Sequence, residues 1–224
     1  MTPNPDLAIL ASTAKSPTMK TFTLFLLLAC LPCCFGQTDT NLLATGVWSE
    51  AVSDSGGHAL RGRLLVYDGS GQPGTNHARV YLELQNVVPG IWVEPIEVYF
   101  GHGGRFDLDF EMSDQLGHPI EPAMAAPWNG PAPKPFWVTL PRESTLRLRA
   151  DAPLGPLEKR EGLQILAGGF RCWTIPPNTT KAFYLSATFT PPQDHPSPLN
   201  YHVWQETLKL PKVKIPVKKR LNDK

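Results

Sequence analysis

Apolar and polar residues alternate along most of the chain after residue 58, and this period of two constrains the fold more than any other feature. In "RVYLELQNV" (79–87), Val80, Leu82 and Leu84 fall on one side of an extended chain, and their more polar neighbours fall on the other. A strand with this pattern buries one face and exposes the other to water. The same alternation recurs at residues 59–68, 96–100, 105–114, 144–150, 181–190 and 206–217.

Turn residues such as Asp68-Gly-Ser-Gly separate these runs, and no run has the 3.6-residue stripe of an amphipathic helix. About seven to nine short strands at such spacing are typical of an immunoglobulin-like sandwich. We therefore predict an all-β, antiparallel, immunoglobulin-like β-sandwich with long Pro-rich loops and a disordered N-terminus. Pro211 and Pro216 remove main-chain donors from the last strand, which should lie at a sheet edge or contain a bulge.

Residues 19–36 have the organisation of a signal peptide. A short basic start is followed at 21–31 by a mostly apolar core that is too short to span a bilayer. Small residues precede Gln37, which predicts cleavage after Gly36. Residues 1–18 then form an upstream extension. We expect the mature chain to be exported, either periplasmic or secreted, with no membrane span after processing.

The signal-peptide segment contains three of the four cysteines. Cys30 and Cys33 form a Cys-x-x-Cys pair, but the pair lacks the helix start or neighbouring base that activates a thiol, so a redox or zinc motif is disfavoured. "LLAC", which ends at Cys30, is similar to a bacterial lipobox, and lipid anchoring through Cys30 is the alternative to cleavage after Gly36. Cleavage would leave Cys172 alone, without a disulfide partner, and we expect its side chain to be buried.

We expect a linker at residues 37–44, one sandwich domain at 45–217 and a basic, solvated tail at 218–224. The net charge of the chain is +1, yet its last 16 residues contain seven basic residues and one acidic residue, so the remainder has a net charge of −5. A mildly acidic domain argues against a nucleic-acid-binding surface. We expect a monomer.

Residues with metal-binding or catalytic chemistry form no recognisable motif. Asp107, Asp109 and Glu111 share one side of a strand, but calcium needs about six to eight converging oxygens. Pairing of strand carboxylates, Glu83 included, with Arg147 and Arg149 on another strand is favoured instead. Neither a nucleophile elbow nor a phosphate-binding glycine loop is present. We therefore expect a protein that is not an enzyme, with no catalytic residue, no cofactor and no metal site. Metal-ligand spacing is missing from the six histidines, His58, His77, His102, His118, His195 and His202.

The stretch "APWNGPAPKPFW" (126–137) is the best candidate for binding a partner. Its prolines favour an extended backbone, and its tryptophans bring large apolar faces with one polar edge. Such rings on a stiff loop suit a protein or glycan of the cell envelope, while a lid over an open sheet edge is the structural alternative. The candidate residues are Trp128, Pro131, Pro133, Pro135 and Trp137.

The strand and turn pattern includes the segments "VWSEAV", "VYLELQNV", "FDLDFEMSDQLGHPI", "VTLPRESTLRLRA", "FYLSATFT" and "VWQETLKLPKV". Together they resemble immunoglobulin-like modules of exported bacterial proteins, particularly of planctomycete type, and more distantly BsuPI-type proteinase-inhibitor domains. The resemblance spans residues 48–217 and implies a non-catalytic binding or structural module at the cell envelope. The inhibitor resemblance implies an alternative, in which an exposed loop, either the Pro-rich stretch 126–137 or residues 151–162, enters a protease cleft. A carbohydrate-active enzyme or carbohydrate-binding module is the second alternative.

Overall fold

Every regular element in the described part of the chain is a β-strand. The structure is a computed structural model, and none of the residues it describes belongs to a helix with the length and apolar character needed to cross a membrane. The all-β class predicted from the alternation is therefore confirmed. The described residues are 41–69, 77–87, 95–101, 107–124, 134–151, 162–167, 171–177, 179–193, 199 and 201–216.

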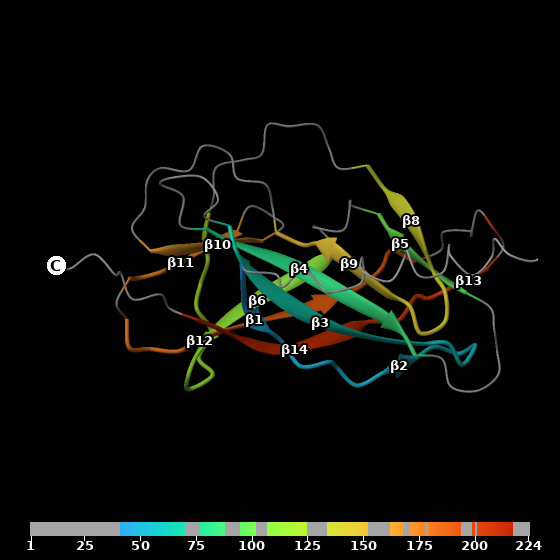
Figure 1. Ribbon diagram of the computed structural model, residues 1–224, viewed down its shortest axis with the longest axis horizontal. Helices are drawn as coiled ribbons and strands as arrows, with labels where there is room; N and C mark the ends of the chain where they lie inside the picture. Colours follow the sequence, from blue (N-terminus) through green and yellow to red (C-terminus); the bar gives the residue numbers. More distant parts are fainter. Residues whose placement is uncertain are drawn as a thin grey trace, which may run out of the picture. The chain divides into compact units, whose positions relative to one another are not determined.

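Fourteen strands form within these ranges, which is more than the seven to nine predicted. The prediction was too low because periodicity does not detect short strands. Three of the strands have only two residues each, and four more, of four or five residues, lie outside the predicted runs, at 42–45, 136–140, 163–167 and 171–175. Strand β1 begins at Leu42, inside the segment 37–44 that was expected to be a linker. In chain order the strands (Figure 1) are β1 (Leu42–Thr45), β2 (Val52–Ser53), β3 (Ala59–Asp68), β4 (His77–Asn86), β5 (Ile96–Phe100), β6 (Leu108–Asp114), β7 (Ala123–Met124), β8 (Phe136–Leu140), β9 (Thr145–Arg149), β10 (Leu163–Ala167), β11 (Arg171–Ile175), β12 (Phe183–Phe189), β13 (His202–Val203) and β14 (Leu208–Ile215).

The largest sheet has eight strands and is built around the long antiparallel pair β3 and β4. Its order is β1-β3-β4-β10-β11-β7, with β2 also paired to β3 and β9 also paired to β4. Most pairings are antiparallel, as predicted, but β10 pairs parallel with β4, and β13 pairs parallel with β5. The purely antiparallel prediction is wrong at these pairs, because each second strand is reached through several intervening strands and not through a tight hairpin.

A second sheet has the order β14-β12-β6 and is antiparallel throughout. Strand β14 lies at its edge, and the register between β12 and β14 shifts between Leu185 and Ala187, opposite Pro211. Proline has no N–H group to donate to a neighbouring strand, and a bulge removes this position from the ladder. The predicted edge position and bulge of the last strand are confirmed.

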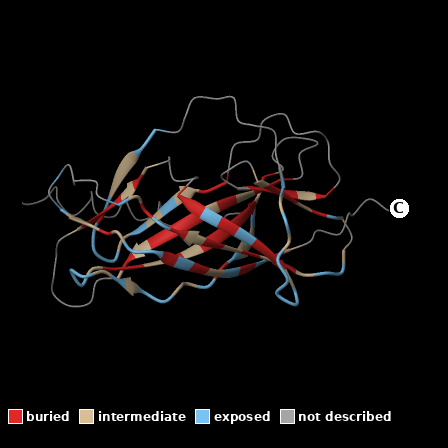
Figure 2. Cartoon of the chain, turned by 180° about the vertical axis from the view of Figure 1, so that it is seen from behind, coloured by how far each residue is buried: buried red, intermediate tan, exposed pale blue. Residues whose placement is uncertain are grey.

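The buried faces of the sheets meet in one apolar core. Gly62 of β3 lies so close to β14 that a Cβ atom there would come within 2.7 Å of Leu210 and 2.9 Å of Leu208. Buried residues alternate with more exposed ones along β6, β12 and β14, as the period of two predicts, whereas β3 and β4 are mostly buried (Figure 2). Cys172 is buried, also as predicted.

The third sheet, with the order β13-β5-β8, positions the candidate site. Strand β13 consists of His202 and Val203, which pair with the first two residues of β5. The next residue, Trp204, is fully buried, and its backbone N–H donates to the carbonyl of Glu97 at 2.9 Å. Its indole N–H donates to the carbonyl of Val52 in β2 at 3.4 Å. These contacts place His202 beside the turn that joins β2 to β3.

Candidate metal centre

The turn between β2 and β3, residues 54–58, is shaped by the side chain of Asp54. Asp54 Oδ1 accepts hydrogen bonds from the backbone N–H groups of Gly56 (2.9 Å) and His58 (3.0 Å). Gly57 donates its N–H to the carbonyl of Asp54 at 3.1 Å and has a φ of 79°, a conformation that favours glycine. An aspartate at the first position of such a turn satisfies main-chain donors that would otherwise lack partners. The second oxygen, Oδ2, remains available for another group.

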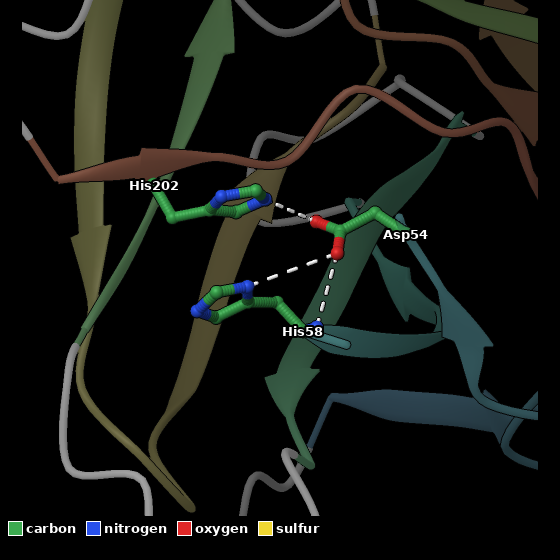
Figure 3. A group of neighbouring side chains, drawn as sticks. All are labelled: Asp54, His58 and His202. Carbon is green, nitrogen blue, oxygen red and sulfur yellow. Dashed lines mark hydrogen bonds and ion pairs between the residues drawn. The ribbon is translucent and has the colours of Figure 1, made fainter. Parts of the chain in front are cut away.

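That group is His202, from a distant part of the chain. Its Nε2 donates to Asp54 Oδ2 at 2.5 Å. The imidazole rings of His58 and His202 stack with their centroids 3.9 Å apart and their planes 11° from parallel. Nδ1 of His58 lies 3.7 Å from Asp54 Oδ1. Figure 3 shows a nitrogen of each ring facing the carboxylate, so that three potential metal ligands, all within 4.8 Å of one another, converge on one region.

The cluster is largely shielded from water. The side chain of Asp54 is 6% exposed, that of His58 is 15% exposed and that of His202 is 30% exposed. Nδ1 of His58 is buried and has no hydrogen-bond partner among the described residues. A buried ring nitrogen without a partner costs about 1 to 3 kcal/mol unless an ion or ligand uses it. A Cβ atom at Gly56 would lie 2.8 Å from Cε1 of His202, so a glycine is needed for the ring to approach the turn.

A second turn, residues 114–118, has the same Asp-x-x-Gly-His sequence and the same main-chain hydrogen bonds. Asp114 Oδ1 accepts from the N–H groups of Leu116 (2.8 Å) and His118 (2.9 Å), and Gly117 has a φ of 86°. Here Asp114 Oδ2 lies 3.2 Å from Nδ1 of His118, whose side chain is 71% exposed. The five-residue turn sequence is therefore sufficient to bring an aspartate to a histidine. The turn at 54–58 differs in two respects, since it is buried and a second histidine reaches it from another segment.

The ligand set of the cluster favours a divalent transition metal ion. Two imidazole nitrogens and one carboxylate oxygen suit Zn²⁺, Cu²⁺ or Ni²⁺, whereas Ca²⁺ and Mg²⁺ prefer sites made of oxygen. Zinc in a tetrahedral site lies about 2.0 to 2.1 Å from such ligands, which then lie about 3.3 Å from one another. The 2.5 Å and 3.7 Å separations from the Asp54 oxygens reach this value with movements of about 1 Å. Because the two rings stack only 11° from parallel, at least one ring must also turn before both nitrogens point at the same ion. Three protein ligands leave one position of a tetrahedral ion for water or an external ligand.

The proton between His202 and Asp54 lies where the ion would bind. Because Nε2 must lose its proton to become a metal ligand, the ion would replace this proton and release it to solvent. The existing hydrogen bond thus holds a nitrogen ligand and an oxygen ligand in place before the ion arrives.

Sequence reasoning missed this site because 148 residues separate Asp54 from His202. Ligand motifs are detected by short spacing, and the expectation of no metal site was based on the lack of such spacing. One signal was present, since the Asp-x-x-Gly-His pattern occurs twice and brings an aspartate to a histidine each time. No local pattern pointed to His202.

The charged strand residues singled out in the sequence form ion pairs or differ from one another in burial. Arg147 pairs with Glu83 on the neighbouring strand at 2.9 Å, which confirms the predicted cross-strand pairing for this residue. Arg149 instead pairs with Asp151, two residues along the chain, at 2.7 Å. Asp109 is exposed and accepts from Arg171 at 2.7 Å. Asp107, just before β6, is buried, so the acidic residues at positions 107, 109 and 111 do not form a single exposed face.

Only part of the proposed partner-binding stretch lies in the described residues. Trp137, in β8, is half-buried, and its ring centroid is 4.8 Å from that of Tyr99 on the neighbouring strand β5. Pro135 is exposed. The candidates outside the described residues are Trp128, Pro131 and Pro133, together with the lipidation candidate Cys30 and the cleavage-site residues Gly36 and Gln37.

His77, the first residue of β4, shows how a buried histidine differs from the cluster. It is 9% exposed, and Nδ1 has no hydrogen-bond partner in the part of the chain described. Burial lowers the pKa of His77; Arg79 and Arg149 lower it as well, whereas Asp151 and Asp68 act in the opposite direction. A metal-binding group containing His77 does not occur in the described ranges. We interpret His77 as a packed histidine whose neutral form suits its surroundings.

Comparison with known proteins gives no match, whether to a protein-family model, to a curated protein or to a solved structure. The functional inference is therefore based on the geometry of Asp54, His58 and His202.

Proposed function

We propose that this chain is an exported, non-catalytic module at the cell envelope that binds one divalent transition metal ion through Asp54, His58 and His202. The observation that carries this function is the convergence of two imidazole nitrogens and a carboxylate oxygen within 4.8 Å. The buried Nδ1 of His58 supports it, because coordination would satisfy a nitrogen that has no hydrogen bond within the described part of the chain.

The proposed module is an immunoglobulin-like β-sandwich. Support comes from the packing of β3 against β14, where Gly62 lies against the side chains of Leu208 and Leu210. The signal-peptide character of residues 19–36 supports export. An ion site suits such a module, because an ion that binds only the folded chain stabilises it.

The decisive test is calorimetric titration of the metal-free chain with Zn²⁺, and separately with Ca²⁺. We expect one Zn²⁺ to bind per chain and Ca²⁺ to bind much more weakly. His202→Gln removes an imidazole ligand, but its amide can still donate to Asp54. Changes in groups that merely support ligands cost 10- to 100-fold in affinity, so we expect the loss of a ligand to weaken Zn²⁺ binding by about 100-fold or more.

His118→Gln is the matched control, because it replaces the same residue type at the end of an identical turn. We expect this variant to bind Zn²⁺ like the unmodified chain. Far-ultraviolet circular dichroism of both variants establishes that each is folded. Absence of Zn²⁺ binding, or an equal loss of affinity in both variants, would exclude the proposed site.

A further inference from the structure

We infer that the ion held by Asp54, His58 and His202 clasps residues 201–204 onto the β2–β3 hairpin, so that ion binding controls the attachment of this segment. This inference rests on the proposed function and extends it, since it gives the bound ion a regulatory effect on the fold.

The ligands come from two segments that are distant in sequence. Asp54 and His58 begin and end one hairpin turn, whereas His202 belongs to β13, 148 residues after Asp54. Coordination by ligands from both segments is a cross-link. Any movement that separates the segments must therefore break a bond to the ion, and the binding energy of the ion opposes that movement.

The main-chain pairing of the segment is short, and its large buried contact is at its end, at Trp204. Strand β13 pairs through only two residues. On the side of the hairpin, the contact made by Trp204 is a hydrogen bond from its indole N–H to Val52, which is long at 3.4 Å. The buried indole of Trp204 anchors the end of the segment. The start of the segment is held by His202, which bonds to Asp54 and stacks on the ring of His58. An ion at His202 would reinforce this start.

The turn at residues 114–118 provides an internal reference. It has the same main-chain hydrogen bonds, and its histidine is exposed. In the part of the chain that the structure describes, no group of metal ligands includes Asp114 or His118. Opening of the 114–118 turn leaves the proposed ion bound at residues 54, 58 and 202. Zinc should therefore not change the hydrogen-exchange rates in this turn.

Hydrogen exchange of the intact chain, with and without Zn²⁺, tests the clasp residue by residue. The informative amides are those of Asp54, which donates to the carbonyl of His58, and of Trp204, which donates to the carbonyl of Glu97. If local opening requires release of the ion, exchange at these amides slows by the factor 1 + [Zn²⁺]/Kd, which is about 100-fold at 100 times the Kd. The corresponding amide of Asp114 should exchange at an unchanged rate.

The outcomes separate the clasp from the site itself. Slower exchange at both Asp54 and Trp204, with no change at Asp114, supports the clasp. If Zn²⁺ binds in calorimetry and protects Asp54 but not Trp204, the clasp is wrong, while the metal site stands. If Zn²⁺ does not bind, both the metal site and the clasp are wrong. In the His202→Gln variant, Zn²⁺ should no longer slow the exchange of Trp204, and persistent slowing would also overturn the clasp.

Discussion

Replacement of Asp54 by alanine should destabilise the chain strongly, even when a chelator removes metal ions. Asp54 accepts hydrogen bonds from the N–H groups of Gly56 and His58 and from Nε2 of His202. Its side chain is only 6% exposed, so water cannot readily replace these bonds. At about 1.5 kcal/mol for each hydrogen bond to a charged group, the low end of the usual range, the three bonds amount to about 4 to 5 kcal/mol. This is a large part of the stability of a typical domain.

Asp114→Ala is the matched control, since Asp114 accepts the same two main-chain hydrogen bonds in an identical turn. The turn at 114–118 is open to water, and the histidine that Asp114 contacts, His118, belongs to the same turn. We therefore expect a clearly smaller loss of stability. Urea unfolding in the presence of EDTA, followed by tryptophan fluorescence and extrapolated linearly, gives both values. Equal losses in the two variants would refute the view that burial and His202 set the first turn apart.

Three further outcomes follow from the structure and the sequence. Gly162→Ala should cost about 2 to 3 kcal/mol, because φ is 110° and the new Cβ would lie 2.3 Å from the carbonyl oxygen of Ile175; unchanged thermal unfolding would contradict this. The pKa of His77 is lowered in the folded state, so the unfolded chain binds more protons and stability falls as pH drops through about 6.5. The urea midpoint of His77→Gln should then change less between pH 7.5 and 5.5 than that of the unmodified chain, and an equal change would exclude His77 as a contributor. Expressed in a bacterial host with its leader, the chain should begin at Gln37 by mass spectrometry, whereas an acylated N-terminus at Cys30 would establish lipidation instead.

The strands with an apolar residue at every second position were predictable from the sequence. The ends of β3, β4, β5, β6, β9, β12 and β14 lie within three residues of the predicted runs. One face of each of these strands lies against the common core, so apolar residues recur at every second position, and this pattern is local. The proline-induced bulge in β14 was predictable for the same reason, since the missing N–H of Pro211 is a property of one residue.

The short strands and the sheet order were not predictable in this way. Strand β13 has two residues, too few for any period to appear, and it exists because β5 offers main-chain partners. Its parallel direction depends on the path of the chain through many other strands, which no local pattern encodes.

The candidate site depends both on a local sequence pattern and on the path of the whole chain. The turn that brings Asp54 to His58 is encoded locally by an aspartate that accepts main-chain bonds and a glycine with positive φ, and its second copy at 114–118 shows that five residues suffice. The approach of His202 depends on β13, on the burial of Trp204 and on the lack of a side chain at Gly56. Only the folded chain brings these features together.

X-ray absorption at the zinc edge of the chain loaded with one equivalent of Zn²⁺ tests the proposed metal centre most directly. We expect scattering from two imidazole rings together with oxygen, with ligand distances of about 2.0 to 2.1 Å, and the loss of one ring in His202→Gln. A spectrum without imidazole scattering, or one with sulfur at about 2.3 Å, would contradict the assignment of Asp54, His58 and His202 as ligands.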